Sequence, residues 1–293
     1  MFAVIISFIF AVFVAFLIAC VYRKEAVGWQ IDSYCFQGNM KTPEFTVNNN
    51  VSIVFLAPVR NAMKGLPYFL SNIKRIKLVF PHTRIIFLEN DSLDETKQFI
   101  LDEFPDIVDT QLKHPLVAID KNTPVMGRGC SRIERMSTLR NQLLTYVETT
   151  DDVVVMIDAD WATNISISNF QKAITYLLSR SDINAVVPVF VSRPFYFPFT
   201  KFYFDTYAFK SEEFPDVRNG KGSQFKLQTK KWPQVDSIPV DSAFGSMAIY
   251  KRHAITHAMY NVIPTEKGCR CEHVSFNEQV GHIHLLPWFE IEA

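Results

Sequence analysis

The chain has 293 residues, of which 48% are hydrophobic, 14% aromatic and 20% charged. This length and composition suit a globular protein with a full-sized core and exclude a low-complexity or disordered chain. Its 30 basic and 30 acidic residues balance, so there is no net positive charge that would favour nucleic acid as a partner.

The first 22 residues predict a membrane anchor. Residues 1–22 contain no charged side chain and are almost all Phe, Ile, Val, Leu and Ala, and about 20 such residues let a helix cross the hydrocarbon core. A cleaved signal peptide has a charged start and a shorter apolar run, so a retained anchor is the better interpretation. We expect residues 23–50, which are polar and aperiodic, to form a stem, and residues 51–293 to form the folded domain.

Two sequence features disagree about the orientation of this anchor. Arg23 and Lys24 follow the apolar segment, and the positive-inside rule then places the body in the cytosol. Triplets beginning at Asn50, Asn90 and Asn164 fit the N-glycosylation pattern, which suits a lumenal body. The residues alone leave both orientations open.

The five cysteines do not identify the redox compartment. Cys269-Arg270-Cys271 lacks the two-residue gap and the second pair of a zinc ribbon. The simpler expectations are two partly buried thiols or one disulfide to Cys130.

Short apolar runs alternate with helical stretches along the first part of the domain. The expected strands are 51–57, 83–89, 153–157 and 185–191. The expected helices are 66–77, 93–104, 131–147 and 167–178. Pro58 is expected to end the first strand, and Asn90-Asp91-Ser92 with Glu95 to cap the second helix. This alternation predicts an α/β fold with an open, mostly parallel sheet, helices on both faces, and a ligand site at the carboxyl ends of the strands.

Asp158 and Asp160 follow the expected strand at 153–157. Successive strand side chains point to opposite faces, so these two carboxylates share a direction if the strand continues. Two carboxylates on one side form a hard oxygen site that suits Mn²⁺ or Mg²⁺. Capping of the helix that starts near Ser166 is an equal alternative on these residues alone.

Four arginines precede this aspartate pair: Arg128, Arg132, Arg135 and Arg140. Arg132 and Arg135 are three residues apart and share a helix face. The planar guanidinium fork suits diphosphate oxygens, so we expect Arg132, Arg135 and Arg140 to bind a phosphorylated ligand. A solvated helix face paired with Glu134 is the alternative for about two of the four.

The order of these motifs resembles glycosyltransferases of the GT-A, nucleotide-sugar-binding fold. It is most similar to membrane-anchored branches, which include fungal mannan-type and capsule-type mannosyltransferases and related viral enzymes. Residues 53–60 resemble the first strand and nucleotide-contacting loop, residues 87–96 the strand and acidic loop that hold base and ribose, and residues 154–160 the strand that ends in the metal-binding Asp-x-Asp. The resemblance covers roughly residues 50–290. It implies a GT-A (Rossmann-like) fold and favours a lumenal catalytic domain in the Golgi or endoplasmic reticulum.

The resemblance also implies roles for individual residues. Pro58, Arg60, Glu89, Asp91 and Asp158 would contact the donor, together with the three arginines named above. Asp158 would also bind Mn²⁺ or Mg²⁺, with Asp160.

An inverting transferase needs a carboxylate to take the proton of the acceptor hydroxyl. Glu272 is the first candidate by position, and Asp241 is the second. A late histidine often completes the metal site of the resembling fold. His282 and His284 would share a strand face and are the candidates, with His273 as a third.

Residues 192–240 interrupt the alternation with no clear period and are rich in Phe, Tyr and Pro. A long irregular insertion in a compact domain is usually functional. Its aromatic residues, from Phe195 through Tyr203 and Tyr207, either form a stacking platform for sugar rings or pack as a small aromatic core.

Together these features predict a metal-dependent glycosyltransferase. It would move a sugar from a nucleoside-diphosphate donor, GDP-mannose or a UDP-sugar, to a hydroxyl of a glycan or glycoprotein. The alternative is a non-catalytic, membrane-anchored protein that keeps the fold as a binding or scaffolding module. A nucleotidyltransferase would need a Gly-rich basic loop after the first strand, which residues 57–65 do not supply convincingly.

Overall fold

The computed structural model describes residues 49–103, 127–160, 164–192, 202–203, 205–212, 235–266 and 268–292. Contacts divide the chain into two compact units, Met1–Pro43 and Glu44–Ala293, and every described residue belongs to the second. None of the helices within the described ranges has the length and apolar character to span a membrane. The predicted anchor and almost all of the predicted stem lie outside these ranges.

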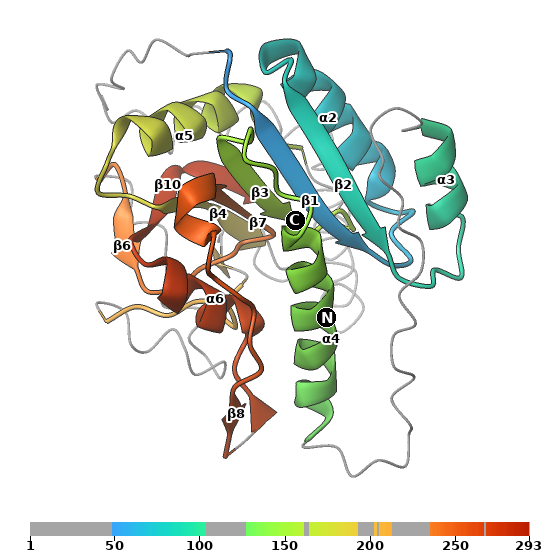
Figure 1. Ribbon diagram of the computed structural model, residues 1–293, viewed down its shortest axis with the longest axis vertical. Coiled ribbons are helices and arrows are strands. Elements are labelled where there is room, and N and C mark those ends of the chain that lie inside the picture. Colours follow the sequence, from blue (N-terminus) through green and yellow to red (C-terminus); the bar gives the residue numbers. More distant parts are fainter. Residues whose placement is uncertain are drawn as a thin grey trace, which may run out of the picture. The chain divides into compact units, whose positions relative to one another are not determined.

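An eight-stranded mixed sheet forms the centre of the second unit, in the order β2-β1-β3-β7-β4-β10-β6 with β5 beside β4 (Figure 1). The strands are β1 (Ile53–Val59), β2 (Thr83–Glu89), β3 (Val153–Ile157), β4 (Ala185–Ser192), β5 (Phe202–Tyr203), β6 (Ile238–Val240), β7 (Met247–Lys251) and β10 (Ile283–Glu292). Strands β1, β2, β3, β4 and β10 run in one direction, and β5, β6 and β7 in the other. The predicted α/β fold with a mostly parallel sheet is confirmed.

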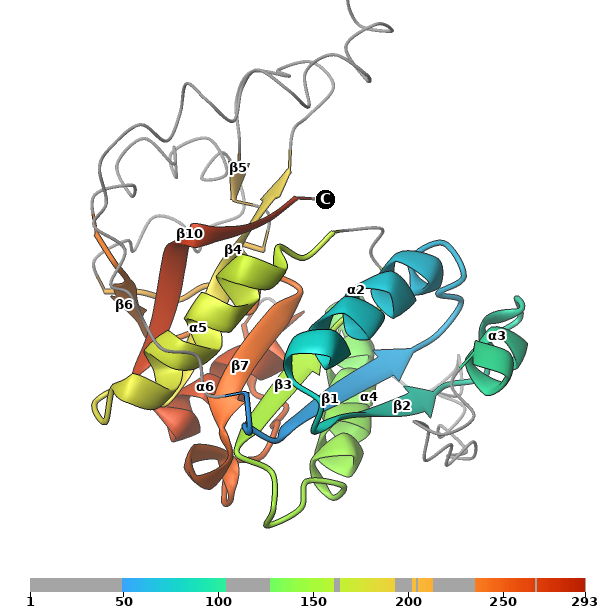
Figure 2. The same ribbon diagram turned by 90° about the horizontal axis from the view of Figure 1, so that it is seen from above.

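Helices cover both faces of this sheet, as the strand–helix alternation predicts. They are α2 (Leu66–Val79), α3 (Thr96–Glu103), α4 (Gly127–Leu144), α5 (Ile167–Ser179), α6 (Glu272–Val280) and the short 3₁₀ helix η4 (Arg252–Ile255). Figure 2 shows α2 and α5 over one face and α4 beneath the other. Phe55 packs in the core on the α2 and α5 side, whereas Val54 and Leu56 pack on the α4 and α6 side. A strand covered on both faces has no polar side, which explains the continuous apolar run.

The predicted end of the first strand at Pro58 is wrong, because β1 continues to Val59. Pairing of β1 with β3 ends at Leu56, whereas pairing with β2 continues to Val59. The Val59 carbonyl accepts from Asn90 on the β2 side, so the alternating Pro58 faces the β3 side. No ladder partner remains there, and the missing amide hydrogen of proline costs no hydrogen bond.

The predicted start of the second helix is also wrong, because α3 begins at Thr96. Ser92 and Leu93 instead bind the loop after β1. The Ser92 hydroxyl accepts from the Asn61 amide at 2.9 Å, and the Leu93 amide donates to the Asn61 side chain at 2.7 Å. Just before α3, the Asp94 carboxylate accepts from the Thr96 amide at 3.1 Å. These side-chain bonds hold residues 92–94 out of the helix and join the loops that follow β1 and β2.

Candidate functional site

The carboxyl ends of β1, β2 and β3 meet at one edge of the sheet, beside α4. A cavity of about 310 Å³ lies there, lined by Pro58, Val59, Arg60, Asn90, Arg132, Arg135, Met136, Leu139, Asp158 and Asp160. The fold therefore brings together residues that the sequence predicted from separate motifs. This is also the position at which open α/β sheets bind ligands.

Arg140 lies buried beside this cavity and binds two carboxylates. Its Nη2 lies 2.9 Å from Asp158 Oδ1, and its Nη1 pairs with Glu272 Oε1. The rings of Phe244 and Tyr260 lie 5.1 and 5.8 Å from its guanidinium carbon. The side chains of Arg140 and Glu272 are 3% and 2% exposed, whereas that of Asp158 is 27% exposed. Asp158 is thus the member of this group that opens into the cavity.

Burial raises the pKa of Asp158 to about 7. Arg140 opposes this rise, and the neighbouring carboxylates of Asp160, Asp205 and Glu272 add to it. Partial burial also raises the pKa of Asp160, although Arg140 again opposes the rise. More carboxylates than guanidinium groups therefore surround Asp158, and a bound cation would relieve their repulsion.

The backbone that carries Asp158 and Asp160 is held from two sides. The Asp158 amide donates to the Ser246 carbonyl at 2.9 Å, which fixes the end of β3 to the turn before β7. On the other side Gly65, directly before α2, packs against the Asp160 backbone. The two carboxylates therefore start from a fixed loop, which limits the entropy lost when they bind a ligand.

Arg132 and Arg135 come from the first half of α4. Neither forms an ion pair with another residue in the described part of the chain, so their guanidinium groups are available to an anion in the cavity. A disulfide between Cys130 and Cys269 joins the start of α4 to β9 (Gly268–Cys269) of the β8–β9 ribbon, in which β8 is Pro264–Thr265. This confirms the expected disulfide to Cys130 and leaves Cys271 as a buried thiol.

At the end of β2, Asn90 lines the cavity, whereas the predicted donor contacts Glu89 and Asp91 do not. Glu89 accepts from the Ser92 amide at 2.6 Å, and Asp91 is exposed with a positive φ of 51°. Neither lines the cavity, whereas Asn90 does and is 5% exposed. The Oδ1 of Asn90 is buried without a hydrogen-bond partner among the described residues. Asn90 is thus a site residue that the sequence reasoning missed, although its place directly after a strand was a usable signal.

The two predicted general bases lie in different surroundings. Glu272, the first residue of α6, reaches Asp158 through Arg140. Asp241 follows β6 and lies 3.6 Å from the Lys210 ammonium. It does not line the cavity, so the structure does not bring it to the aspartate pair.

The predicted histidine ligands lie near the amino ends of the parallel strands, away from the cavity at their carboxyl ends. His282 and His284 stand at the start of β10, where Ile283 pairs with Ala185 at the start of β4, whereas Asp158 follows the end of β3. In addition, β10 lies beside β4, and β7 lies between β4 and β3, so β10 and β3 are three strand spacings of about 4.8 Å apart. His282 and His284 therefore cannot bind a metal held by Asp158 and Asp160, and that prediction is corrected.

His273 lies closer to the aspartates but is enclosed. Its ring stacks on Phe244 with 3.6 Å between centroids, and its Nε2 lies 3.9 Å from Glu272. Burial lowers the pKa of His273 well below its usual value. Within the described ranges no group of three or more histidine, cysteine or acidic side chains is arranged to hold a metal.

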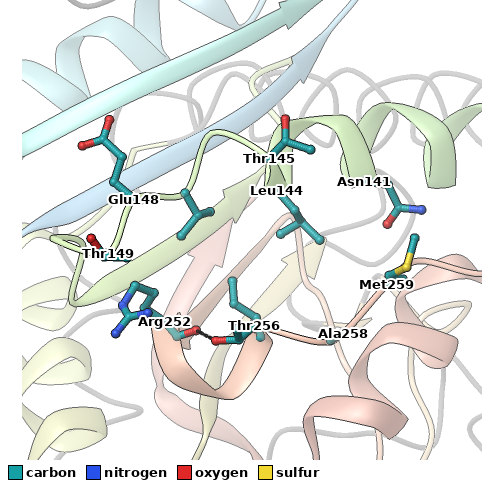
Figure 3. Close-up of a pocket in the computed structure, with 11 residues that line it drawn as sticks. Asn141, Leu144, Thr145, Glu148, Thr149, Arg252, Thr256, Ala258 and Met259 are labelled. Atoms are coloured by element: carbon teal, nitrogen blue, oxygen red, sulfur yellow. Dashed lines mark hydrogen bonds between the residues drawn. The ribbon is translucent and has the colours of Figure 1, made fainter.

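A larger cavity of about 370 Å³ lies at the amino edge of the sheet, between the end of α4 and η4 (Figure 3). Several of its polar side chains are bonded within the protein. The Thr145 hydroxyl donates to the Gln142 carbonyl at 2.7 Å, and Glu148 lies 2.8 Å from Arg84. Leu144 and Met259 give it an apolar wall (Figure 3). Because it has no carboxylate pair and no unpaired arginine cluster, the smaller cavity is the candidate site.

The predicted aromatic platform is described only in part. Phe195 and its neighbours through residue 201 lie outside the described residues. Tyr203 is fully buried and packs edge-on against Phe209 at 5.5 Å, which fits the aromatic-core interpretation. Tyr207 is 51% exposed, so it does not belong to that core.

No protein family description and no curated protein sequence matches the chain. Solved structures show a distant likeness. One is S. aureus TarS, residues 1–349, in complex with UDP-GlcNAc, with 13% identity over 83% of this chain and 58% of that one and a TM-score of 0.48. Another is the mannosyltransferase PcManGT from Pyrobaculum calidifontis in complex with GDP-Man and Mn²⁺, with 14% identity over 86% and 60% and a TM-score of 0.48.

A mycobacterial protein is similar at 11% identity over 80% of this chain and 65% of that one, with a TM-score of 0.45. This chain thus aligns with less than two thirds of each of these proteins. Identities and TM-scores at this level describe a distant likeness in fold and carry no activity with them.

Proposed function

We propose that this protein is a metal-dependent glycosyltransferase that uses a nucleoside-diphosphate sugar, GDP-mannose or a UDP-sugar, as donor. One observation carries the proposal. The cavity at the carboxyl ends of β1, β2 and β3 combines two carboxylates, Asp158 and Asp160, with two arginines, Arg132 and Arg135, that form no ion pair with any described residue. A diphosphate bridged to a divalent cation needs both kinds of group in one place.

The aspartate pair fits Mn²⁺ or Mg²⁺. Both carboxylates offer hard oxygen ligands, and burial raises the pKa of each, so their ionised forms gain stability when a cation is near. The metal, when bound, would neutralise negative charge on the departing diphosphate. Arg140 binds Asp158 from the buried side and holds that carboxylate in one orientation.

The other cavity residues fit the remaining parts of a donor. Arg132 and Arg135 would donate to diphosphate oxygens, while Pro58 and Asn90 at the ends of β1 and β2 would contact the nucleoside. Of the two predicted bases, only Glu272 belongs to the Asp158 group, through Arg140. It is 2% exposed and does not line the cavity, so it would have to leave Arg140 to accept a proton from the acceptor hydroxyl.

We further propose that residues 1–22 anchor the enzyme in a membrane of the endoplasmic reticulum or Golgi, with the body in the lumen. The Cys130–Cys269 disulfide supports a lumenal body, because structural disulfides persist mainly in oxidising compartments. The acceptor would be a hydroxyl of a glycan or glycoprotein.

The test is calorimetric titration of the full-length protein in detergent with UDP and GDP, with and without Mn²⁺, beside an assay for nucleotide release from UDP- and GDP-sugars. We expect Mn²⁺-dependent binding of one nucleotide, turnover of its sugar, and loss of both in Asp158→Ala and Asp160→Ala. Asp182→Ala, which removes an exposed ion pair with Arg180, is the matched control and should behave like the wild type. Metal-dependent binding without turnover would favour the scaffolding alternative, and EDTA-resistant turnover would contradict the metal assignment.

A further inference from the structure

Tyr207 presents an aromatic ring to solvent in a fixed position. The residue is 51% exposed, yet its hydroxyl donates to the Cys269 carbonyl at 2.6 Å. A tyrosine whose hydroxyl is held in place offers a rigid apolar face, and little conformational entropy is lost when a ligand packs on it.

The backbone of the Tyr207 segment is attached to the same turn as the aspartate loop. Asp205, two residues earlier, accepts from the amide of Gly245 at 3.3 Å. The next residue, Ser246, accepts from the amide of Asp158 at 2.9 Å. Two adjacent residues of one turn therefore hold both the Tyr207 segment and the loop of the proposed metal ligand.

The hydroxyl end of Tyr207 is attached to the other side of the site. Cys269, which accepts its hydrogen bond, is bonded to Cys130 of α4, and Figure 1 shows the β8–β9 ribbon beside the first turns of this helix. Arg132 lies two residues after Cys130 and lines the donor cavity. Glu272 lies three residues after Cys269 and pairs with Arg140.

Electrostatics agree with this placement. Burial raises the pKa of the Tyr207 hydroxyl, Cys271 and Glu272 add to the rise, and Arg132 opposes it. The Tyr207 hydroxyl thus lies within electrostatic range of both Glu272 and Arg132.

From this geometry we infer that Tyr207 forms the acceptor subsite and that the acceptor is a saccharide. A sugar ring has an apolar face of C–H groups and a rim of hydroxyls. An exposed aromatic ring such as that of Tyr207 suits the apolar face. This inference rests on the proposed transferase function and adds to it the chemical class of the acceptor.

The experiment compares full-length wild type with Tyr207→Ala, Tyr207→Trp and Tyr68→Ala. Tyr68 is an aromatic residue of α2 with 47% exposure and serves as the matched control. The donor is the sugar nucleotide that the wild type turns over, and the acceptors are methyl glycosides of mannose, glucose and galactose beside a Ser/Thr peptide.

We expect transfer to at least one methyl glycoside. Tyr207→Ala should raise the KM for that glycoside about tenfold, which corresponds to the loss of one aromatic contact. The donor KM should change far less, Tyr207→Trp should keep most of the acceptor affinity, and Tyr68→Ala should match the wild type. A merely structural role would instead raise both KM values and lower the melting temperature.

Transfer to the peptide alone, or an unchanged glycoside KM in Tyr207→Ala, would overturn the inference. If the wild type turns over no donor, the transferase proposal fails separately. Saturation-transfer NMR with the same methyl glycosides then tests the subsite directly. Signals in wild type that disappear in Tyr207→Ala support the inference, and no signal in wild type overturns it.

Discussion

Gly65 and Asp160 are in direct contact through their backbones. A Cβ atom added to Gly65 would lie 2.3 Å from the carbonyl carbon of Asp160, far inside van der Waals distance. The φ angle of Gly65 is −94°, which any residue adopts, so the glycine is needed for space and not for backbone freedom. Because the opposing atoms are backbone, no side-chain rotation can relieve the contact.

Gly65→Ala should therefore displace the Asp160 loop and weaken Mn²⁺-dependent nucleotide binding by at least about tenfold, since misplaced first ligands lose most of their binding free energy. Calorimetric titration measures this. Gly281→Ala is the control, because nothing lies within 4 Å of its added Cβ, although its φ of 64° makes it strained. That control should lose about 1–3 kcal/mol of stability and keep its affinity. Wild-type affinity in Gly65→Ala would show that this contact does not position Asp160.

Metal-dependent nucleotide binding should weaken as the pH falls through about 7, because burial raises the pKa of Asp158 to that value and protons then compete with the cation. The metal-free protein should show the linked effect on stability. Between its ordinary value of 3.8 and about 7, the folded carboxyl binds more protons than the unfolded one, so stability falls as the pH rises through this window.

Asp158→Asn, which cannot ionise, should consequently raise the metal-free melting temperature more at about pH 8 than at about pH 5. Thermal melts at both pH values, with EDTA and with Mn²⁺, check this. Equal shifts at the two pH values would mean that Asp158 is not the group responsible.

Arg140 and Glu272 should show strong energetic coupling. Arg140→Met leaves the Glu272 carboxylate, 2% exposed, without its partner and should cost about 3–5 kcal/mol of unfolding free energy. Glu272→Gln should also destabilise, and the double variant should lose clearly less than the sum of the two. Urea denaturation of the four proteins gives the coupling.

The exposed pair Arg180 and Asp182, with side chains 47% and 60% exposed, is the matched control for this cycle. Its coupling should be about 0–1 kcal/mol. Additive losses at Arg140 and Glu272 would contradict a buried ion pair between them.

The strands could be predicted where local pattern alone determines them. The bounds predicted for β2 and β3 agree with the structure, because each strand centres on an apolar run that polar residues limit. The antiparallel direction of β7 could not be predicted. Its five residues are as completely buried as those of β3, and an apolar run carries no information about which way it crosses the sheet.

In the candidate site, too, local sequence predicts some residues and not others. Asp158 and Asp160 follow a strand, and Arg132 and Arg135 share a helix face, so neighbours in sequence were sufficient to find them. The partner of Glu272 lies 132 residues away, which no local rule reaches. For His282 and His284, the alternation of side chains along a strand predicted a shared face. That alternation does not say whether the two residues lie near the amino or the carboxyl ends of the parallel strands.

The Cys130–Cys269 bridge spans 139 positions of the chain, and Asp158 lies within that span. A protein nicked once by a protease between the two cysteines would therefore remain one covalent molecule and separate into two fragments only on reduction. Electrophoresis of nicked protein with and without a reducing agent thus reports the oxidation state of the bridge without any knowledge of donor or acceptor.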